Sequence, residues 1–142
     1  MVTSKRITEE QELEAAFDIR QKVFVEEQQV AADEEYDEFD KTAQHYLASF
    51  NGTPCGTARW RPTENGVKLE RFAVLEPYRN KAVGSSILQK VLTDVKAAEP
   101  NKTIYLHAQL KAVPFYERHG FNKVGDIFTE CDIQHYKMLM HA

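Results

Sequence analysis

A short polar segment, YRNKAVGSSIL, brings together residue types that can hold a phosphate group. It follows an apolar stretch at residues 68–75 and precedes an amphipathic stretch, so it is expected to join a strand to a helix. The unpaired N–H groups at the start of such a helix bind anions, and Gly84 lets a ligand approach the backbone closely. Arg79 and Lys81 add positive charge, and Ser85 adds a hydroxyl donor. The segment therefore predicts a site for a pyrophosphate.

Other phosphate-binding motifs are absent from the chain. It contains no G-x-x-x-x-G-K-[ST] loop and no G-x-G-x-x-G turn, so neither a P-loop nor a dinucleotide-binding fold is expected. On local physics alone, the same segment also fits a polar helix start that binds no ligand.

The segment resembles the R-x-x-G-x-G/A signature of the GNAT N-acetyltransferase superfamily, with Ala82 in place of the first glycine. A second segment, LHAQLKAVPFYERHGF, is similar to the strand and helix that follow in this family. IRQKVFVEEQ near the amino terminus and IQHYKM near the carboxy terminus, which contains His135, resemble the ElaA-like branch. The first two segments cover residues 68–121, and the expected order of elements extends the resemblance along most of the chain.

The resemblance implies that acetyl-CoA is the co-substrate and that its pyrophosphate lies at the turn. It also implies a splayed strand before the turn, whose main-chain N–H groups would polarise the thioester carbonyl. Gln109 stands where many members of the family have an asparagine that contacts the cofactor. The expected cofactor-binding residues are Phe72, Ala73, Val74, Arg79, Asn80, Lys81, Ala82, Val83, Gly84, Ser85 and Gln109.

Transfer of an acetyl group from a thioester to an amine needs an acid that protonates the departing thiolate. A tyrosine phenol stays protonated at neutral pH, and the resemblance places Tyr116 beside the thioester sulfur. Without the resemblance, Tyr116 would be interpreted as a core residue on a short helix. We therefore predict that Tyr116 is the acid.

Glu70 is predicted to be the base, since it shares one side of its strand with Phe72 and Val74. An exposed strand glutamate paired with a cross-strand cation also fits this residue. His107 and His135 are the substitutes, because imidazole titrates near neutrality. No cysteine stands next to a plausible base and no G-x-S-x-G elbow is present, so direct transfer in a ternary complex is favoured over an acyl-enzyme.

The acceptor side of the predicted site is rich in carboxylates. Six of the eight residues from 33 to 40 are acidic, and this run is expected to be a solvated loop outside the core. The resemblance implies that this loop and the helix before it form a lid over the acceptor. The carboxylates would suit a cationic amine, whereas Arg20 and Arg71 would favour an acceptor that carries a carboxylate. The sequence leaves both alternatives open.

Hydrophobic spacing and turn signals predict the elements that position these residues. Apolar residues at helical spacing predict helices at residues 9–25 and 83–99 and a short helix at 112–119. Asn51 and Gly52 predict a tight hairpin. The expected strands lie at residues 5–7, 45–50, 53–60, 67–75, 103–109, 121–128 and 135–140. The resulting order, β-α-βββ-α-β-α-ββ, indicates an α/β or α+β fold with a mixed central sheet flanked by helices.

Composition indicates one globular domain over residues 1–142, long enough to bury a core without metals or disulfides. With 18 basic and 22 acidic residues the net charge is −4, which disfavours a nucleic-acid partner. No apolar run is long enough for a membrane span, and the histidines and cysteines show no metal-ligand spacing, so neither a membrane nor a metal is expected. The lack of a secretory-signal core and of paired cysteines indicates a cytoplasmic location.

The predicted activity is that of an acetyl-CoA-dependent N-acetyltransferase acting on a small-molecule or peptide amine. The alternative is a non-catalytic CoA-binding sensor or interaction module, which Ala82 and Gln109 leave open and Tyr116 argues against. A nucleotide-binding or phosphopeptide-binding domain is disfavoured by the acidic balance and the absent purine motifs. Dimers are common among similar proteins, so the resemblance makes a homodimer one expected state.

Overall fold

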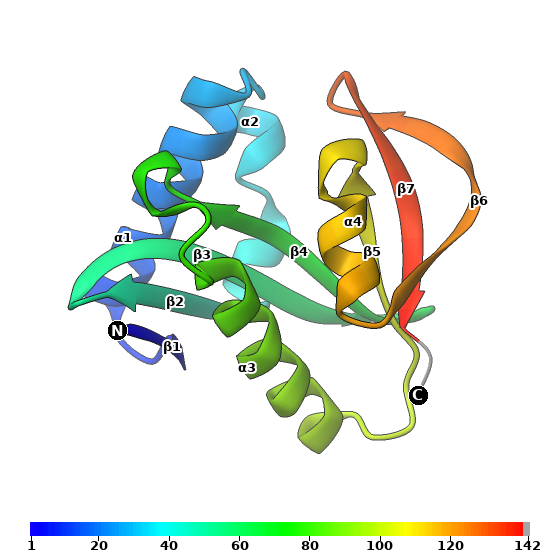
Figure 1. Ribbon diagram of the computed structural model, residues 1–142, viewed down its shortest axis with the longest axis horizontal. Helices are drawn as coiled ribbons and strands as arrows, with labels where there is room; N and C mark the ends of the chain where they lie inside the picture. Colours follow the sequence, from blue (N-terminus) through cyan, green and yellow to red (C-terminus); the bar gives the residue numbers. More distant parts are fainter. Residues whose placement is uncertain (141–142) are drawn as a thin grey trace.

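A seven-stranded sheet forms the centre of the molecule in the computed structural model, which describes residues 1–140 (Figure 1). The strands follow one another across the sheet in the order β1-β2-β3-β4-β5-β7-β6. Their bounds are β1 Val2–Arg6, β2 Gln44–Phe50, β3 Thr53–Thr63, β4 Gly66–Val74, β5 Ile104–Gln109, β6 Phe121–Glu130 and β7 Ile133–Met140. The α-helices are α1 Glu10–Arg20, α2 Ala32–Glu35, α3 Val83–Ala98 and α4 Val113–Arg118. A π-helical segment, η1, covers Gln21–Glu27. The short 3-10 helices are η2 Glu38–Lys41, η3 Glu76–Tyr78 and η4 Leu110–Ala112.

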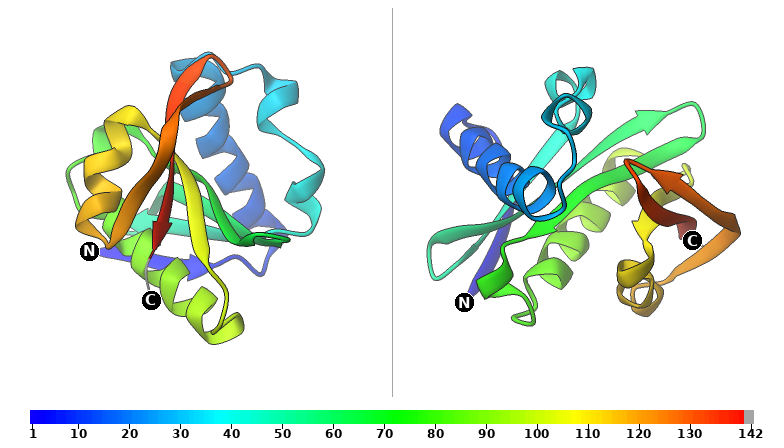
Figure 2. Two further views of the ribbon diagram at one scale, coloured as in Figure 1. Left: turned by 90° about the vertical axis from the view of Figure 1, so that its right-hand side faces the viewer. Right: turned by 90° about the horizontal axis from the view of Figure 1, so that it is seen from above.

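The helices cover both faces of this sheet. α1 packs on β2, β3 and β4, whereas α3 packs on β1 to β4 from the opposite face (Figure 2). α3 turns one apolar stripe towards the strands, and its buried members are Val83, Ile87, Leu88, Val91 and Val95. α4 lies against β5 and β6. The mixed sheet with helices on both faces confirms the predicted fold class.

The sheet opens between its two parallel strands, β4 and β5. β4 stays paired with β3, and β5 stays paired with β7. A bulge in β4, at which Arg71 has a φ of 60°, bends β4 near the end of this pairing. β4 and β5 therefore diverge towards their carboxyl ends, since they pair only where Val67, Lys68 and Leu69 face Ile104, Tyr105 and Leu106.

The first helix differs from the predicted single helix at residues 9–25. α1 ends at Arg20, and the chain continues through wider π-helical turns as far as Glu27. Apolar spacing cannot separate these two forms, because both bury the same side of the segment, including Ala16 and Val23. The wider turns bring Gln28 to the opening between β4 and β5.

The acidic run at residues 33–40 is not the solvated loop that we predicted. It forms α2 and η2, and the Glu35 side chain is only 4% exposed. Two buried arginines cause this arrangement. Arg20 donates to Glu35 (2.8 Å) and Asp40 (2.7 Å), and Arg59 donates to Asp37 (2.8 and 2.9 Å) and Asp40 (2.6 Å). The carboxylates therefore neutralise cations that would otherwise be buried alone.

A third arginine extends this arginine–carboxylate cluster to the edge of the opening. Arg71 pairs with Glu35 and Asp37, each at 3.2 Å, and donates to the Glu35 carbonyl oxygen. Arg20 and Arg71 are thus held by carboxylates of the chain itself. This pairing weakens the alternative in which these two arginines bind a carboxylate of the acceptor.

The cluster predicts a loss of stability in acid. Burial raises the pKa of Asp37, but Arg59 and Arg71 outweigh it and lower this pKa to about 2. Because the folded value lies below the unfolded value, the stabilisation is complete above about pH 4 and is lost as the pH falls towards 2. Asp37 should contribute about 2 kcal/mol to this loss. Glu35 has the opposite effect on the pH dependence of stability. Burial raises its pKa, and this outweighs Arg71 and Arg20, which lower it.

Urea unfolding at a series of pH values measures this effect, and Asp37→Asn is the matched variant. In this variant the free energy of unfolding should decrease less in acid, because the contribution of Asp37 is missing. A wild-type unfolding free energy that stays constant through this range would contradict the prediction.

Candidate acetyltransferase site

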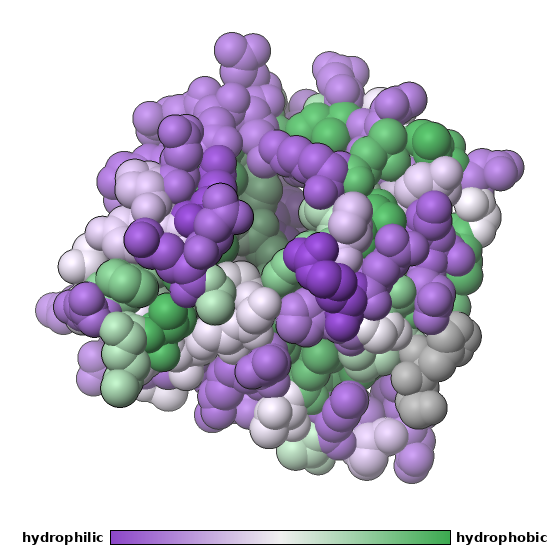
Figure 3. Space-filling model, in the orientation of Figure 1, coloured by the Kyte–Doolittle hydropathy of each residue, from purple (hydrophilic) through white to green (hydrophobic). Residues whose placement is uncertain are grey.

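The opening between β4 and β5 leads into a cavity of about 390 Å³. Figure 3 shows the corresponding hollow in the face of the molecule. β4 and β5 form its floor, η1 and α2 form one wall, and α4 with the β6–β7 turn forms the other. Of the residues predicted from the sequence, those that line the cavity are Glu70, Arg71, Phe72, Ala73, Val74, Arg79, His107, Gln109, Tyr116 and His135.

The predicted pyrophosphate turn lies between β4 and α3, on one side of this cavity. Asn80 and Ala82 both have left-handed backbone conformations, with φ values of 67° and 64°. The first intrahelical bond runs from the Ser86 N–H to the Ala82 carbonyl (3.1 Å). The N–H groups of Val83 and Gly84 precede it, so they lie outside the helical bonding pattern and are placed for an anion.

Gly84 lies where α3 comes close to α4. A Cβ atom at this position would lie 3.4 Å from the Phe115 ring, which is as close as ordinary contact allows. Nearby, the Ser85 hydroxyl lies 3.1 Å from His119 Nε2, and Lys81 Nζ lies 5.6 Å from the centre of the Phe50 ring. The turn therefore lies against the helix that carries Tyr116, at a distance that would also accommodate an alanine at position 84.

Arg79 is held in place at the mouth of the cavity. Its Nε donates to the Val74 carbonyl (2.9 Å), and its two terminal nitrogens donate to Glu27 (2.9 Å each). A carboxylate held in this bidentate way fixes the guanidinium plane. Glu27 on η1 was not singled out in the sequence, because its partner lies 52 residues away.

The left-handed conformation of Ala82 predicts a stabilising substitution. A residue with a side chain pays about 1–2 kcal/mol in this region, and glycine loses about 0.5–1 kcal/mol of backbone entropy on folding. Ala82→Gly should therefore raise the unfolding free energy by about 0.5–1 kcal/mol in urea unfolding.

Gly52→Ala is the matched control for this prediction. Gly52 has a φ of 86°, and a Cβ added there would have no atom within 4 Å. This substitution should lower the unfolding free energy, because only the backbone conformation opposes it. An Ala82→Gly protein that is less stable than the wild type would contradict the account of the turn.

Tyr116 on α4 lies at the centre of the far wall. Its ring meets Phe72 of β4 edge-on, with centroids 6.1 Å apart, and also contacts Phe115 and Phe121. Burial alone raises the pKa of Tyr116, so its phenol stays protonated at neutral pH. Within residues 1–140 no group hydrogen-bonds its hydroxyl, which leaves this donor available to a ligand in the cavity.

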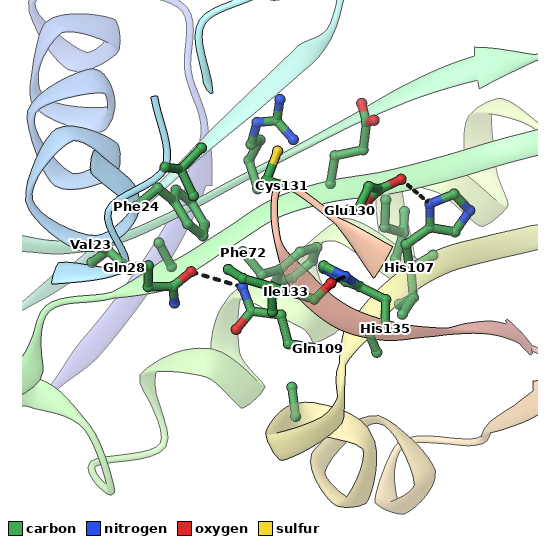
Figure 4. Close-up of a pocket in the computed structure, with 18 of the residues that line it drawn as sticks. Val23, Phe24, Gln28, Phe72, His107, Gln109, Glu130, Cys131, Ile133 and His135 are labelled. Carbon is green, nitrogen blue, oxygen red and sulfur yellow. Dashed lines mark hydrogen bonds and ion pairs between the residues drawn. The ribbon is translucent and has the colours of Figure 1, made fainter. Parts of the chain in front are cut away.

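The amides of Gln28 and Gln109 cross the cavity at its mouth. Gln109 Nε2 donates to Gln28 Oε1 (2.8 Å), as Figure 4 shows. Gln109 ends β5, and Gln28 follows η1, so this bond joins the two walls. A cofactor arm entering between β4 and β5 would meet this pair. The sequence predicted Gln109 but gave no signal for its partner.

Glu70 lines the cavity but is held by three cations. Its carboxylate lies 2.8 Å from Arg61, 3.0 Å from Arg59 and 3.1 Å from Lys68. Burial raises the pKa of Glu70, but these cations outweigh it and lower the pKa. A carboxylate in this environment accepts a proton poorly. The structure therefore favours the paired-glutamate interpretation over the predicted role as base.

Two histidines and a glutamate line the remaining wall. His107 Nδ1 lies 3.0 Å from Glu130 Oε2, and His135 Nδ1 lies 2.7 Å from the Ile133 carbonyl oxygen. Figure 4 shows His107 on β5 beside Glu130, which lies with Cys131 at the end of the β6–β7 hairpin, and His135 on β7. The sequence had named both histidines as substitutes, but Glu130 and Cys131 carry no local signal that places them at the cavity.

The described residues 1–140 contain no group of three or more side chains placed to hold a metal ion. In the same part of the chain, no helix combines the length and apolar character needed to cross a membrane.

The sheet opens between parallel strands, the start of α3 offers N–H donors, and the buried phenol of Tyr116 lines the cavity. Comparison with known proteins identifies the family. The profile described as "Acetyltransferase (GNAT) domain" matches residues 5–142, so the chain belongs to the GNAT acetyltransferase family. Members of this family typically use acetyl-CoA as co-substrate and act on amine acceptors.

Three relatives support this assignment and the resemblance to the ElaA-like branch. The uncharacterized N-acetyltransferase YjcF of Bacillus subtilis is 37% identical over 131 residues, covering 92% of this chain and 93% of YjcF. The crystal structure of Escherichia coli ElaA superposes with a TM-score of 0.89 at 27% identity, covering 99% of this chain and 100% of ElaA. An acyl-CoA N-acyltransferase from Pseudomonas aeruginosa has a TM-score of 0.85 at 26% identity, covering 99% of each chain.

Proposed function

We propose that the protein is an acetyl-CoA-dependent N-acetyltransferase, a single domain over residues 1–142 that acetylates a primary amine. The observation that carries this proposal is the Tyr116 hydroxyl, a donor without a partner among residues 1–140 in the cavity between β4 and β5. A CoA-binding turn alone would need no such group. A protonated phenol beside a thioester has a direct use, since it can donate to the sulfur as the thiolate leaves.

The cofactor lies along the diverging strand and the turn in this proposal. The pyrophosphate binds the N–H groups of Val83, Gly84 and Ser85, and the turn from Arg79 to Ala82 supplies the surrounding charge and backbone. The pantetheine arm follows Phe72, Ala73 and Val74, where β4 has no pairing with β5. A main-chain N–H of this stretch polarises the thioester carbonyl. Gln109 contacts the arm after exchanging its bond to Gln28.

Direct transfer in a ternary complex is supported by the state of the cysteines. Cys55 is buried in the core, away from the cavity lining. Cys131 lines the cavity, but the neighbouring Glu34 carboxylate raises the pKa of its thiol to about 11. A thiol in this state is a poor nucleophile, because the thiolate is the reactive form. The acetyl group therefore passes from sulfur to the amine without an enzyme-bound intermediate.

In this proposal the acceptor is an amine of a small molecule or a peptide. The enzyme works in the cytoplasm. A homodimer is one expected assembly. Both cysteines are free, which is usual for proteins of the reducing cytoplasm. Arg20 and Arg71 pair with Glu35, Asp37 and Asp40, so the charges of both sets are neutralised within the chain, and this cluster favours neither a cationic amine nor an acceptor that carries a carboxylate.

Release of free thiol from acetyl-CoA in the presence of a pooled set of primary amines tests this function. We expect release that depends on both the protein and the amines, with acetylated amine detected by mass spectrometry. CoA binding in calorimetry without thiol release would instead support the non-catalytic CoA-binding module. Absence of CoA binding would overturn both.

A further inference from the structure

His135 occupies a constrained place in the cavity wall. It lies near the start of β7 and directly opposite Gln109 of β5. Directly opposed residues of neighbouring strands project from the same face of a sheet, so His135 and Gln109 face the cavity together. The His135 residue is 8% exposed, and its ring stacks on Phe128 at 5.8 Å with an interplanar angle of 22°.

The hydrogen bond of His135 fixes which ring nitrogen carries the proton. Its Nδ1 lies 2.7 Å from the Ile133 carbonyl oxygen. A carbonyl oxygen only accepts hydrogen bonds, so Nδ1 must be the donor. In the neutral ring the lone pair is then on Nε2, and no group among residues 1–140 hydrogen-bonds this atom. The fold thus presents an oriented proton acceptor in a largely buried position.

We propose that His135 is the general base of the acetyl transfer. This inference rests on the proposed function and replaces Glu70, whose carboxylate is held by Arg59, Arg61 and Lys68. His135 and Tyr116 line the same cavity, so a base and an acid are both available to one bound pair of substrates. The base is placed beside Gln109, a residue proposed to contact the cofactor arm.

The proton and electron balance of the step is complete with these two residues. The nitrogen of a neutral amine forms a bond to the thioester carbon, and His135 Nε2 takes the proton that this nitrogen loses. The bond from carbon to sulfur breaks, and the sulfur leaves with the electron pair and takes a proton from Tyr116. Solvent then carries the proton of His135 to the tyrosinate, which restores both residues and leaves an amide and free CoA.

His107 is the competing candidate on the same wall. Its Nδ1 pairs with Glu130, which likewise leaves Nε2 as the acceptor. In the register of β5 and β7, however, His107 faces Lys137 and lies two residues further from the open end of β5 than Gln109. The side chains of His107 and Glu130 are also more exposed, at 23% and 47%. The geometry therefore favours His135.

Several charged or titratable groups face the same cavity and shape the pH dependence of the step. β4 contributes Lys68, Glu70 and Arg71, and η4 contributes Lys111. α2 contributes Glu34 and Glu35, the turn before α3 contributes Arg79, and the β6–β7 hairpin contributes Glu130 and Cys131. A pH profile alone would not separate these groups from His135, so the test needs variants.

His135→Asn is the sharpest variant, because its side-chain amide nitrogen stands near the place of Nδ1 and can still donate to Ile133. It lacks an atom in the place of Nε2. With the amine that the wild type acetylates, turnover should fall by about 10²-fold or more. The calorimetric affinity for CoA should stay within about threefold of the wild-type value, since such a change is small in free energy. His107→Asn should lower turnover much less than His135→Asn does.

Three results would overturn the proposal. Turnover by His135→Asn within about threefold of the wild type would exclude the base role. A larger loss of turnover in His107→Asn than in His135→Asn would assign the base to His107. Nitrogen-15 NMR of the CoA complex provides a readout that needs no acceptor, and a neutral His135 protonated at Nε2 would exclude the base role directly. Absence of any wild-type turnover would instead overturn the proposed function, and the base role with it.

Discussion

Arg59→Met is expected to lower the free energy of unfolding by about 3–5 kcal/mol, measured by urea unfolding with the fluorescence of the single tryptophan, Trp60. Arg59 is 0% exposed and pairs with Asp37, Asp40 and Glu70 at 2.6 to 3.0 Å. Methionine fills a similar volume but supplies no positive charge. The three carboxylates would then repel one another in a poorly solvated place, and the acidic segment would lose its main anchor to the sheet.

Lys22→Met is the control for the loss of a single positive charge. Lys22 pairs with Asp18 one helical turn away at 3.0 Å, and the two side chains are 53% and 62% exposed. An exposed pair of this kind contributes little, so the change should stay below about 0.5 kcal/mol. An Arg59→Met protein within about 1 kcal/mol of the wild type would contradict the structural role assigned to the cluster.

Tyr116→Phe is expected to lower turnover by about 10²-fold or more, while the affinity for CoA changes little. Only the hydroxyl is removed, and no group among residues 1–140 depends on it for a hydrogen bond. The ring contacts with Phe72, Phe115 and Phe121 remain available to phenylalanine. The variant should therefore release thiol more slowly at saturating acetyl-CoA, because the chemical step is affected. Its free energy of unfolding should stay close to that of the wild type.

Tyr105→Phe is the matched control for this substitution. Tyr105 is also buried, but its hydroxyl is 2.7 Å from the hydroxyl of Thr63, and the residue does not line the cavity. Removal of the Tyr105 hydroxyl should lower the free energy of unfolding slightly and should leave turnover almost unchanged. If Tyr116→Phe keeps turnover within about threefold of the wild type, the role of Tyr116 as the acid is excluded.

Local patterns predicted most of the fold. The apolar stripe of α3, the alternation in the strands and the Asn51-Gly52 hairpin depend on residues close in sequence. The turn from Arg79 to Ser85 and the helix bearing Tyr116 could also be predicted, because residue types and spacing define both. Ala82 departs from the family signature that this segment resembles. The structure adds that it has the left-handed conformation that glycine adopts at lower energy.

The partners of the polar residues could not be predicted in the same way. Nothing near residues 33–40 indicates that Arg59, about 20 positions later, is buried beneath them. Glu70 was assigned as a base from its strand position, but its reactivity depends on Arg59 and Arg61 across the sheet. These interactions depend on strand register and on burial, and both arise only when distant segments pack together.

A crystal structure of the protein with CoA bound tests the central claim most directly. We predict that the diphosphate oxygens lie within hydrogen-bond distance of the N–H groups of Val83, Gly84 and Ser85, at about 3 Å. The sulfur should lie within reach of the Tyr116 hydroxyl, in the cavity between β4 and β5. Coenzyme bound elsewhere on the molecule, or a sulfur that points out of this cavity, would contradict the account.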